Sequence, residues 1–324
     1  MLRDGQVVAQ VPAATPRDEL VRLLVGRPVE AQYPRRARPR GEVLLRVTGL
    51  TRRGAVEDVS FAVRAGEVVG LAGLVGSGRT ELVRAIFGAD PVDRGEIAVA
   101  GERLPTGSIQ AARRHGLGLV PEDRQGQGLV PLLSVEENLG LAALARCSRA
   151  ALLGRRRLHP HAAAVVRDLH IRTPSLEQEV RYLSGGNQQK VVIGKWLIDA
   201  SRVLLLDEPT RGIDVGAKVE IYELMNHLTA QGAGIFMVSS DLPEILGMSD
   251  RILVMSEGRI TGDVPAQDAT QELVMDLATR SREVAVGWLS PRDQAEAPRP
   301  ARPARPGRAA RGVAAPVGHH GAAL

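Results

Sequence analysis

The chain has 324 residues, enough for one large domain or two small ones, and 44% of them are hydrophobic. Its single cysteine, Cys147, excludes an internal disulfide framework and is typical of a reducing compartment. There is no run of about 18 apolar residues, and the N-terminus lacks the apolar core of a signal peptide. We therefore expect the chain to lie in the cytosol and to reach a membrane only through a partner.

The net charge of +5 is concentrated at the C-terminal end. From Ser281 onward there are seven Arg and three acidic residues, which together supply four of the five net charges. The remainder is close to neutral, and aromatic residues make up only 2% of the chain. It thus lacks both the basic face and the stacking platforms of nucleic-acid binders, so we expect no nucleic-acid partner.

The first residues of the chain repeat a segment near its end. Laid without a gap on residues 254–277, residues 1–24 place Gly5 on Gly258, Val11-Pro12-Ala13 on Val264-Pro265-Ala266, and Glu19-Leu20-Val21 on Glu272-Leu273-Val274. We interpret residues 1–30 as the last piece of a preceding copy of the same domain, with chance similarity between two hairpin-plus-helix segments as the alternative.

Two further segments have no periodicity. Residues 31–42 are rich in Pro and Arg, as expected of a linker between two such copies. Residues 288–324 are dominated by Ala, Pro, Arg and Gly, and cannot bury enough apolar surface to offset their ordering entropy. We expect them to form a disordered basic tail.

Residues 43–280 alternate short β-branched runs with longer helical patterns, which is typical of an α/β domain with a mostly parallel sheet. The predicted strands are residues 68–72, 117–120, 203–206, 234–238 and 252–255.

A phosphate-binding loop is indicated directly after the first of these strands. The pattern Gly-x-x-x-x-Gly-Lys-Ser/Thr fits residues 73–80, except that Arg79 stands where Lys is expected. Glycines let backbone N–H groups turn toward phosphate oxygens, and the N-terminus of the following helix adds a favourable dipole. Alone, the pattern is equally compatible with a structural strand–helix turn. The candidate nucleotide-binding residues are Gly73, Gly76, Ser77, Gly78, Arg79 and Thr80, and the Thr80 hydroxyl is also a candidate Mg²⁺ ligand.

Two acids follow the apolar run at residues 203–206. A buried parallel strand would place Asp207 and Glu208 at the carboxyl edge of the sheet, where ligands bind in such folds. Asp207 would hold Mg²⁺ through water, and Glu208 would orient or deprotonate the attacking water. Acid pairs at strand ends are common, so this signal is only moderate by itself.

The third motif is Leu183 followed by Ser184, Gly185, Gly186 and Asn187, at the start of a predicted helix. It would present a serine hydroxyl and a helix N-terminus to a phosphate. With the phosphate loop before it and Asp207-Glu208 about 20 residues after it, the order resembles the ATP-binding cassette (ABC) ATPases from about residue 43 to residue 278.

The resemblance implies an α/β phosphate-loop NTPase cassette with an inserted helical subdomain at about residues 125–185 and an antiparallel β edge. It implies ATP and Mg²⁺ as cofactors. It also implies a head-to-tail dimer with a partner cassette, in which the Ser184 motif meets the γ-phosphate bound by the opposite chain.

Finer motifs are similar to the second cassette of bacterial sugar importers that carry two fused cassettes, such as ribose, galactose and xylose systems. These motifs are residues 120–124, 211–218 and 239–244. That class implies transmembrane permease subunits, an indirect periplasmic or lipoprotein sugar-binding protein, and a location at the cytoplasmic face of the cell membrane. It also makes residues 1–30 the tail of the first cassette. Asp214 would bridge the dimer, or merely cap a helix starting at Val215.

Four departures from the family pattern weaken the site. Arg79 replaces Lys, Ser240 stands where most cassettes place a His, and Glu122 occupies the position of a Gln that senses Mg²⁺. No Tyr or Phe lies between Gly49 and Val56 to stack on adenine. We therefore expect a slow ATPase in which Glu208, Ser240 and Glu122 are the candidate catalytic residues.

Three alternatives remain open. The chain could be a non-enzymatic half that lends its signature motif to a partner, a soluble cassette protein of DNA repair or translation, or a decayed remnant. Metal binding by His159 and His161 is not expected, because no Cys or acid cluster adjoins them in the sequence.

Overall fold

The computed structural model describes residues 2–3, 6–12, 14–15, 33–144, 148–149, 152–153 and 155–280. The tail predicted at residues 288–324, Cys147 and most of residues 1–30 lie outside this description. The strands are β1 (Leu2–Arg3), β2 (Gln6–Val7), β3 (Val43–Arg52), β4 (Val56–Arg64), β5 (Val68–Gly73), β6 (Arg94–Val99), β7 (Glu102–Arg103), β8 (Leu117–Val120), β9 (Ser148–Arg149), β10 (Leu152–Leu153), β11 (Val203–Asp207), β12 (Gly234–Val238), β13 (Arg251–Ser256) and β14 (Arg259–Pro265). The α-helices are α2 (Arg79–Phe87), α3 (Ile109–Arg114), α4 (Val135–Gly140), α6 (Arg155–Asp168), α7 (Gly185–Ile198), α8 (Val215–Ala230), α9 (Leu242–Met248) and α10 (Gln271–Ala278). Short helical turns are η2 (Arg124–Gly128), η3 (Val180–Tyr182) and η4 (Ala266–Asp268).

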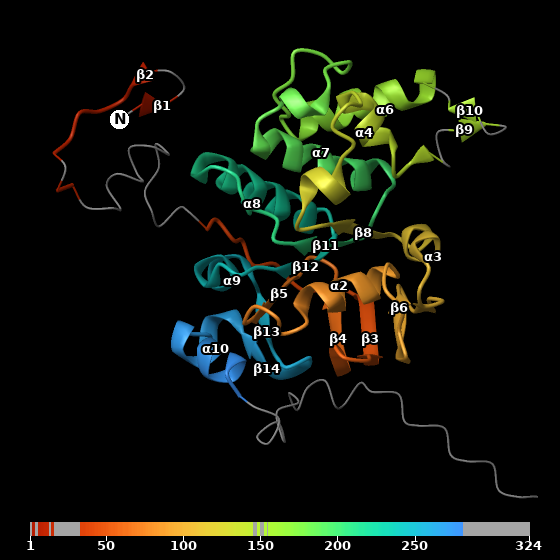
Figure 1. Cartoon of the computed structure of the whole chain (residues 1–324), viewed down its shortest axis with the longest axis vertical. Coiled ribbons are helices and arrows are strands. Elements are labelled where there is room, and N and C mark those ends of the chain that lie inside the picture. The colour runs from red at the N-terminus through yellow and green to blue at the C-terminus, as the bar shows by residue number, and fades with distance from the viewer. Residues whose placement is uncertain are drawn as a thin grey trace, which may run out of the picture. The chain divides into compact units, whose positions relative to one another are not determined.

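The candidate site lies on a six-stranded sheet with the strand order β14-β13-β5-β12-β11-β8 (Figure 1). All neighbours from β13 to β8 are parallel, and only β14 at the edge is antiparallel. Every residue of β11 and β12 is buried, as expected for central strands covered on both faces. The predicted strands at 117–120 and 234–238 agree with β8 and β12, and the other three are longer by one or two residues.

A second sheet covers part of this core. It is fully antiparallel, with the strand order β4-β3-β6-β7. Phe61 of β4 stacks on Phe236 of β12 with ring centroids 4.7 Å apart, so the two sheets share one apolar core. The predicted α/β cassette with an antiparallel β edge is confirmed, and this separate sheet adds to the antiparallel strand β14.

Helices α4, α6 and α7 pack on one another and form the layer drawn in yellow to green at the top of Figure 1. The indole N–H of Trp196 on α7 donates to the carbonyl of Leu119 on β8 at 2.7 Å, which ties this layer to the sheet. The extent of the helical subdomain, at about residues 125–185, stays a prediction. None of the described helices has the length and apolar character that a membrane span requires.

The short hairpin β1–β2 pairs in the register that the internal repeat predicts. Leu2 pairs with Val7, and the repeat places these residues on Met255 and Ile260, which also pair across the β13–β14 turn. That residues 1–30 end a preceding cassette stays a prediction.

Residues 33–40, inside the predicted linker, are bonded to the domain. The guanidinium of Arg35 donates to both carboxylate oxygens of Asp250, to Asn226, to Thr229 and to the carbonyl of Gly66. The side chains of Arg35 and Asp250 are 6% and 9% exposed. The part of this segment around Arg35 is therefore packed against the domain, whereas residues 36–40 are exposed.

Candidate nucleotide site

The loop between β5 and α2 has the backbone that a phosphate loop needs. Gly78, which caps α2, has φ of +100°, and a Cβ atom there would lie 2.3 Å from the carbonyl oxygen of Ala55. Only glycine fits such a position without shifting its neighbours. The hydroxyl of Ser77 is buried and has no hydrogen-bond partner within the described chain. The loop thus carries an unsatisfied polar group that a phosphate oxygen can satisfy.

Arg79, at the first position of α2, turns its guanidinium toward its own chain. It is only 9% exposed and donates from Nη1 to the carbonyl of Ser239 at 2.7 Å. Burial lowers the pKa of this guanidinium, and the carboxylates of Glu208 and Asp207 oppose that shift. The planar fork therefore lies between the phosphate loop and the residues after β12, where a lysine ammonium would stand as a compact charge.

The two predicted acids lie at the carboxyl end of β11, as expected. Glu208 follows directly after the strand and has φ of +50°, a strained conformation for a residue with a side chain. The hydroxyl of Ser240 donates to Glu208 Oε2 at 3.2 Å. Burial raises the pKa of Glu208, while the Ser240 hydrogen bond and Arg79 hold it down. A partly buried carboxylate with a raised pKa suits a general base.

Asp207 and Thr80 fit a magnesium ion. Asp207 is 3% exposed, its Oδ1 atom has no hydrogen-bond partner among the described residues, and burial raises its pKa. The side chain of Thr80, the second predicted ligand, opposes this shift and therefore lies close to the Asp207 carboxyl. Mg²⁺ prefers such hard oxygen ligands and is commonly held by one or two protein groups plus phosphate.

A cavity of about 530 Å³ opens beside this pair. Thr80, Asp207 and Glu122 all line it, so the structure brings the predicted Mg²⁺ ligands and the predicted sensing residue to one space. Glu122 forms an ion pair with Arg211. Its sensing role stays a prediction.

The signature motif starts α7. Asn187 Nδ2 donates to the hydroxyl of Ser184 at 2.9 Å, and Asn187 Oδ1 accepts from the backbone N–H of Arg172. Ser184 therefore does not cap its own helix with its side chain. A Cβ atom on Gly186 would lie 2.5 Å from that of Ala217 on α8, so glycine is required there for close packing.

The signature motif and the phosphate loop of this chain, both of which the structure describes, are not bonded to each other. Within the described residues, no hydrogen bond joins residues 184–187 to residues 73–80. Asp214 accepts from the backbone N–H of Ala217 at 2.9 Å and caps α8, which confirms the capping interpretation; its role in a dimer stays a prediction.

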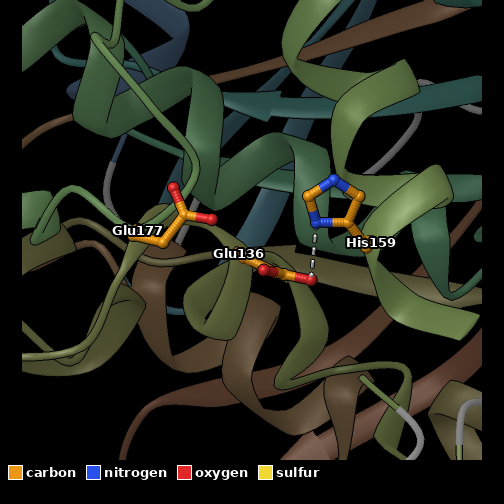
Figure 2. A group of neighbouring side chains, drawn as sticks. All are labelled: Glu136, His159 and Glu177. Carbon is orange, nitrogen blue, oxygen red and sulfur yellow. Dashed lines mark ion pairs between the residues drawn. The ribbon is translucent and has the colours of Figure 1, made fainter. Parts of the chain in front are cut away.

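Glu136 and Glu177, which are far from His159 in the sequence, lie beside it in the folded chain. Possible ligand atoms of His159, Glu136 and Glu177 lie within 4.8 Å of one another (Figure 2). The dashed line in Figure 2 is the ion pair between Glu136 and His159. His159 and Glu177 are exposed, and exposed acids often gather without a metal, so we interpret this cluster as a surface ion pair.

Three residues that contact the site had no predicted role. Ser239 accepts the Arg79 hydrogen bond, and the buried Glu244 bonds the Ser239 hydroxyl. Arg124 donates to the carbonyls of Arg211 and Gly212, at 2.8 and 3.2 Å. All three lie in family-like motifs, and that was the one signal in the sequence that pointed to them.

Comparison with known proteins agrees with this geometry. The family model for the ABC transporter matches residues 56–211, a stretch that includes the phosphate loop, the signature and the two acids. Over this stretch the chain is similar to the ABC transporter family. Its fold is also that of solved cassettes. A nucleotide-free ATP-binding cassette from an ABC transporter aligns over 74% of this chain and 100% of its own, with a TM-score of 0.62 at 20% identity. An ATP-binding subunit of an ABC transporter aligns over 73% of this chain and 100% of its own, with a TM-score of 0.59 at 26% identity.

Several curated proteins are much more similar to this chain in sequence. A ribose import ATP-binding protein of Rubrobacter xylanophilus is 65% identical over 89% of this chain and 58% of its own length. Proteins of the same name from Corynebacterium glutamicum and Bacillus subtilis are 59% and 48% identical, over 86% and 87% of this chain. The chain spans between 53% and 58% of the length of these three relatives.

Proposed function

We propose that this chain is the ATP-binding subunit of a bacterial carbohydrate importer, in which it couples ATP binding and hydrolysis to sugar uptake. The observation that carries the proposal is the meeting of Thr80, Asp207, Glu208 and Ser240 at the carboxyl edge of the parallel sheet. The names of the similar proteins support a sugar, and ribose in particular, as the cargo of the complete importer.

In this proposal the phosphate loop binds ATP, and Thr80 and Asp207 hold Mg²⁺, which neutralises phosphate charge when bound. Glu208 accepts a proton from the attacking water or orients it, and its raised pKa supports that role. Ser240, whose hydroxyl donates to Glu208, would then contact the γ-phosphate.

The signature supports a head-to-tail dimer with a partner cassette. Because Asn187 donates to Ser184, the hydroxyl proton of Ser184 is left for an external acceptor. The phosphate bound by the opposite cassette is an acceptor of this kind, and the N-terminus of α7 adds favourable dipole. Asp214 lies at the start of the neighbouring helix α8 and would contact the partner cassette in that dimer.

An exposed apolar patch in the segments around residues 130 and 182 supports contact with a permease. Val130, Leu132 and Tyr182 are exposed apolar or aromatic side chains, and the backbones of residues 130–133 and 180–183 are hydrogen-bonded. Such a patch suits an apolar helix of a membrane partner. The chain would then lie at the cytoplasmic face of the cell membrane, and a sugar-binding protein outside would act on it only indirectly.

A second candidate function is a catalytically weak half that supplies its signature to a partner cassette. The turned-in guanidinium of Arg79 favours it, because this fork is bonded to Ser239 and is not a compact phosphate ligand. The register of β1–β2, which matches the turn of β13–β14, supports a preceding cassette as that partner.

One experiment separates the two candidates. Mg²⁺-ATP turnover by the purified chain is measured beside Glu208→Gln, with Glu223→Gln on the exposed side of α8 as a control. Slow turnover that disappears only in Glu208→Gln supports an ATPase in its own right. Nucleotide binding without turnover in all three proteins supports the weak half, and failure to bind nucleotide contradicts both.

A further inference from the structure

A buried carboxylate that was not predicted as a site residue accepts hydrogen bonds from two loops of the candidate site. Glu244 lies on α9 and is 1% exposed. Its Oε1 accepts from the hydroxyl of Thr210 at 2.8 Å, and its Oε2 accepts from the hydroxyl of Ser239. Both oxygens are therefore used, and both donors are themselves buried, at 2% exposure each.

The two donors belong to the loops that carry the candidate catalytic residues. Thr210 follows Glu208 by two positions, in the turn after β11. Glu208 has φ of +50°, and such strain persists only where the surrounding structure fixes the backbone. The Thr210–Glu244 hydrogen bond holds this turn against α9.

The second loop is fixed through Ser239. Its hydroxyl oxygen also accepts from the backbone N–H of Asp241 at 3.0 Å, and its carbonyl accepts from Arg79. Ser239 directly precedes Ser240, whose hydroxyl donates to Glu208 at 3.2 Å. The Ser240–Glu208 contact thus joins two loops that share one buried support.

We propose that Glu244 is a positioning residue that fixes the loops of Glu208 and Ser240 relative to each other. The inference rests on the proposed function, because it explains how Glu208 and Ser240 are held in the positions that ATP hydrolysis would need. A carboxylate suits the position because it accepts two hydrogen bonds, whereas the amide of glutamine has only one accepting oxygen. Releasing the turn after β11 would lower kcat with little effect on KM, because that turn carries Glu208 and nucleotide binding depends on the loop at residues 73–80.

The first test needs no nucleotide. Hydrogen–deuterium exchange is compared for wild type, Thr210→Val, Thr210→Ser and Glu244→Gln, with Ser249→Ala as the control. Ser249 is buried, and its hydroxyl makes no hydrogen bond within the described chain, so the control removes a buried hydroxyl without breaking one.

Thr210→Val is nearly isosteric and replaces the hydroxyl with a methyl group. The proposal predicts exchange about tenfold faster at the Asp241 amide, which is in the other loop, from the loss of one hydrogen bond to a charged group. Thr210→Ser keeps the hydroxyl and should exchange like wild type. If Thr210→Val accelerates exchange only around residue 210, the shared support is refuted; this holds even if Glu244→Gln fails to fold.

The second test is Mg²⁺-ATP turnover by the same variants. A loss of about tenfold in kcat for Thr210→Val, with KM within about twofold and recovery in Thr210→Ser, supports positioning. Equal turnover in Thr210→Val and wild type overturns it. If the wild type does not turn over, the proposed ATPase fails, and the exchange experiment alone decides the role of Glu244.

Discussion

Arg35 offers the sharpest test of how this domain is held together. Its guanidinium donates to Asp250, Asn226, Thr229 and the carbonyl of Gly66, and it is 6% exposed. In Arg35→Ala, Asp250 would keep only the backbone N–H of Val68 as a described donor at 2.8 Å, with its charge still buried. Removing one partner of a buried ion pair costs about 3–5 kcal/mol.

A loss of that size is a large part of the total stability of about 5–15 kcal/mol that folded domains have. We therefore expect Arg35→Ala to lower the free energy of unfolding by about 3–5 kcal/mol in urea titrations followed by tryptophan fluorescence. The free energy of unfolding of Arg35→Lys should fall between those of wild type and Arg35→Ala, because an ammonium keeps the charge but not the planar fork of the guanidinium.

The neighbouring Arg36 is the matched control. Its side chain is 68% exposed and lies 3.9 Å from Glu223, which is 40% exposed. Exposed pairs of this kind contribute about 0–1 kcal/mol, so Arg36→Ala should unfold almost as wild type does. If Arg35→Ala loses no more than Arg36→Ala, residues 33–40 are a free linker and the argument from burial is wrong.

Three further predictions concern the site and the core. Arg79→Lys should raise kcat for ATP about a hundredfold, because a compact ammonium restores a preorganised phosphate contact, and unchanged turnover would contradict this. Burial lowers the pKa of Lys195 to about 8 from the usual 10.5. Between about pH 8 and pH 10.5 the unfolded chain therefore binds more protons at this residue than the folded chain does. Raising the pH from about 7 to about 9.5 should then stabilise wild type relative to Lys195→Met in urea titrations. An equal response of both proteins would refute the buried charge. Gly78→Ala should abolish nucleotide binding, since its Cβ would meet the Ala55 carbonyl at 2.3 Å, whereas Gly101→Ala, with φ of +83° and open space, should lose only about 1–3 kcal/mol of stability and bind normally. Nucleotide affinity measured for both variants decides this last case.

The sequence located much of the site because its signals are local. The apolar run before Asp207 and Glu208 predicts a buried strand, and parallel strands bring their carboxyl ends to one edge of a sheet. The glycine spacing at residues 73–80 predicts the phosphate loop, because the backbone conformation of such a loop is fixed by neighbours in the chain. These expectations needed no knowledge of distant contacts.

The partners of the same residues could not be predicted in this way. The sequence showed that Arg79 replaces a lysine, but not that its guanidinium would bond the carbonyl of Ser239. It left two roles open for Asp214, and only the geometry of α8 assigned the helix cap. It also left Glu136 and Glu177 far from His159, because positions distant in the chain meet only when helices pack.

By itself, then, the sequence determined the five parallel strands of the main sheet, the phosphate loop and the order of the family motifs, because periodicity and glycine spacing act over a few residues. The tertiary structure alone decided that Arg35 is buried against Asp250 and that Glu244 supports two loops. A buried charge is tolerated only where packing supplies its partners, and those partners come from parts of the chain that no local pattern connects.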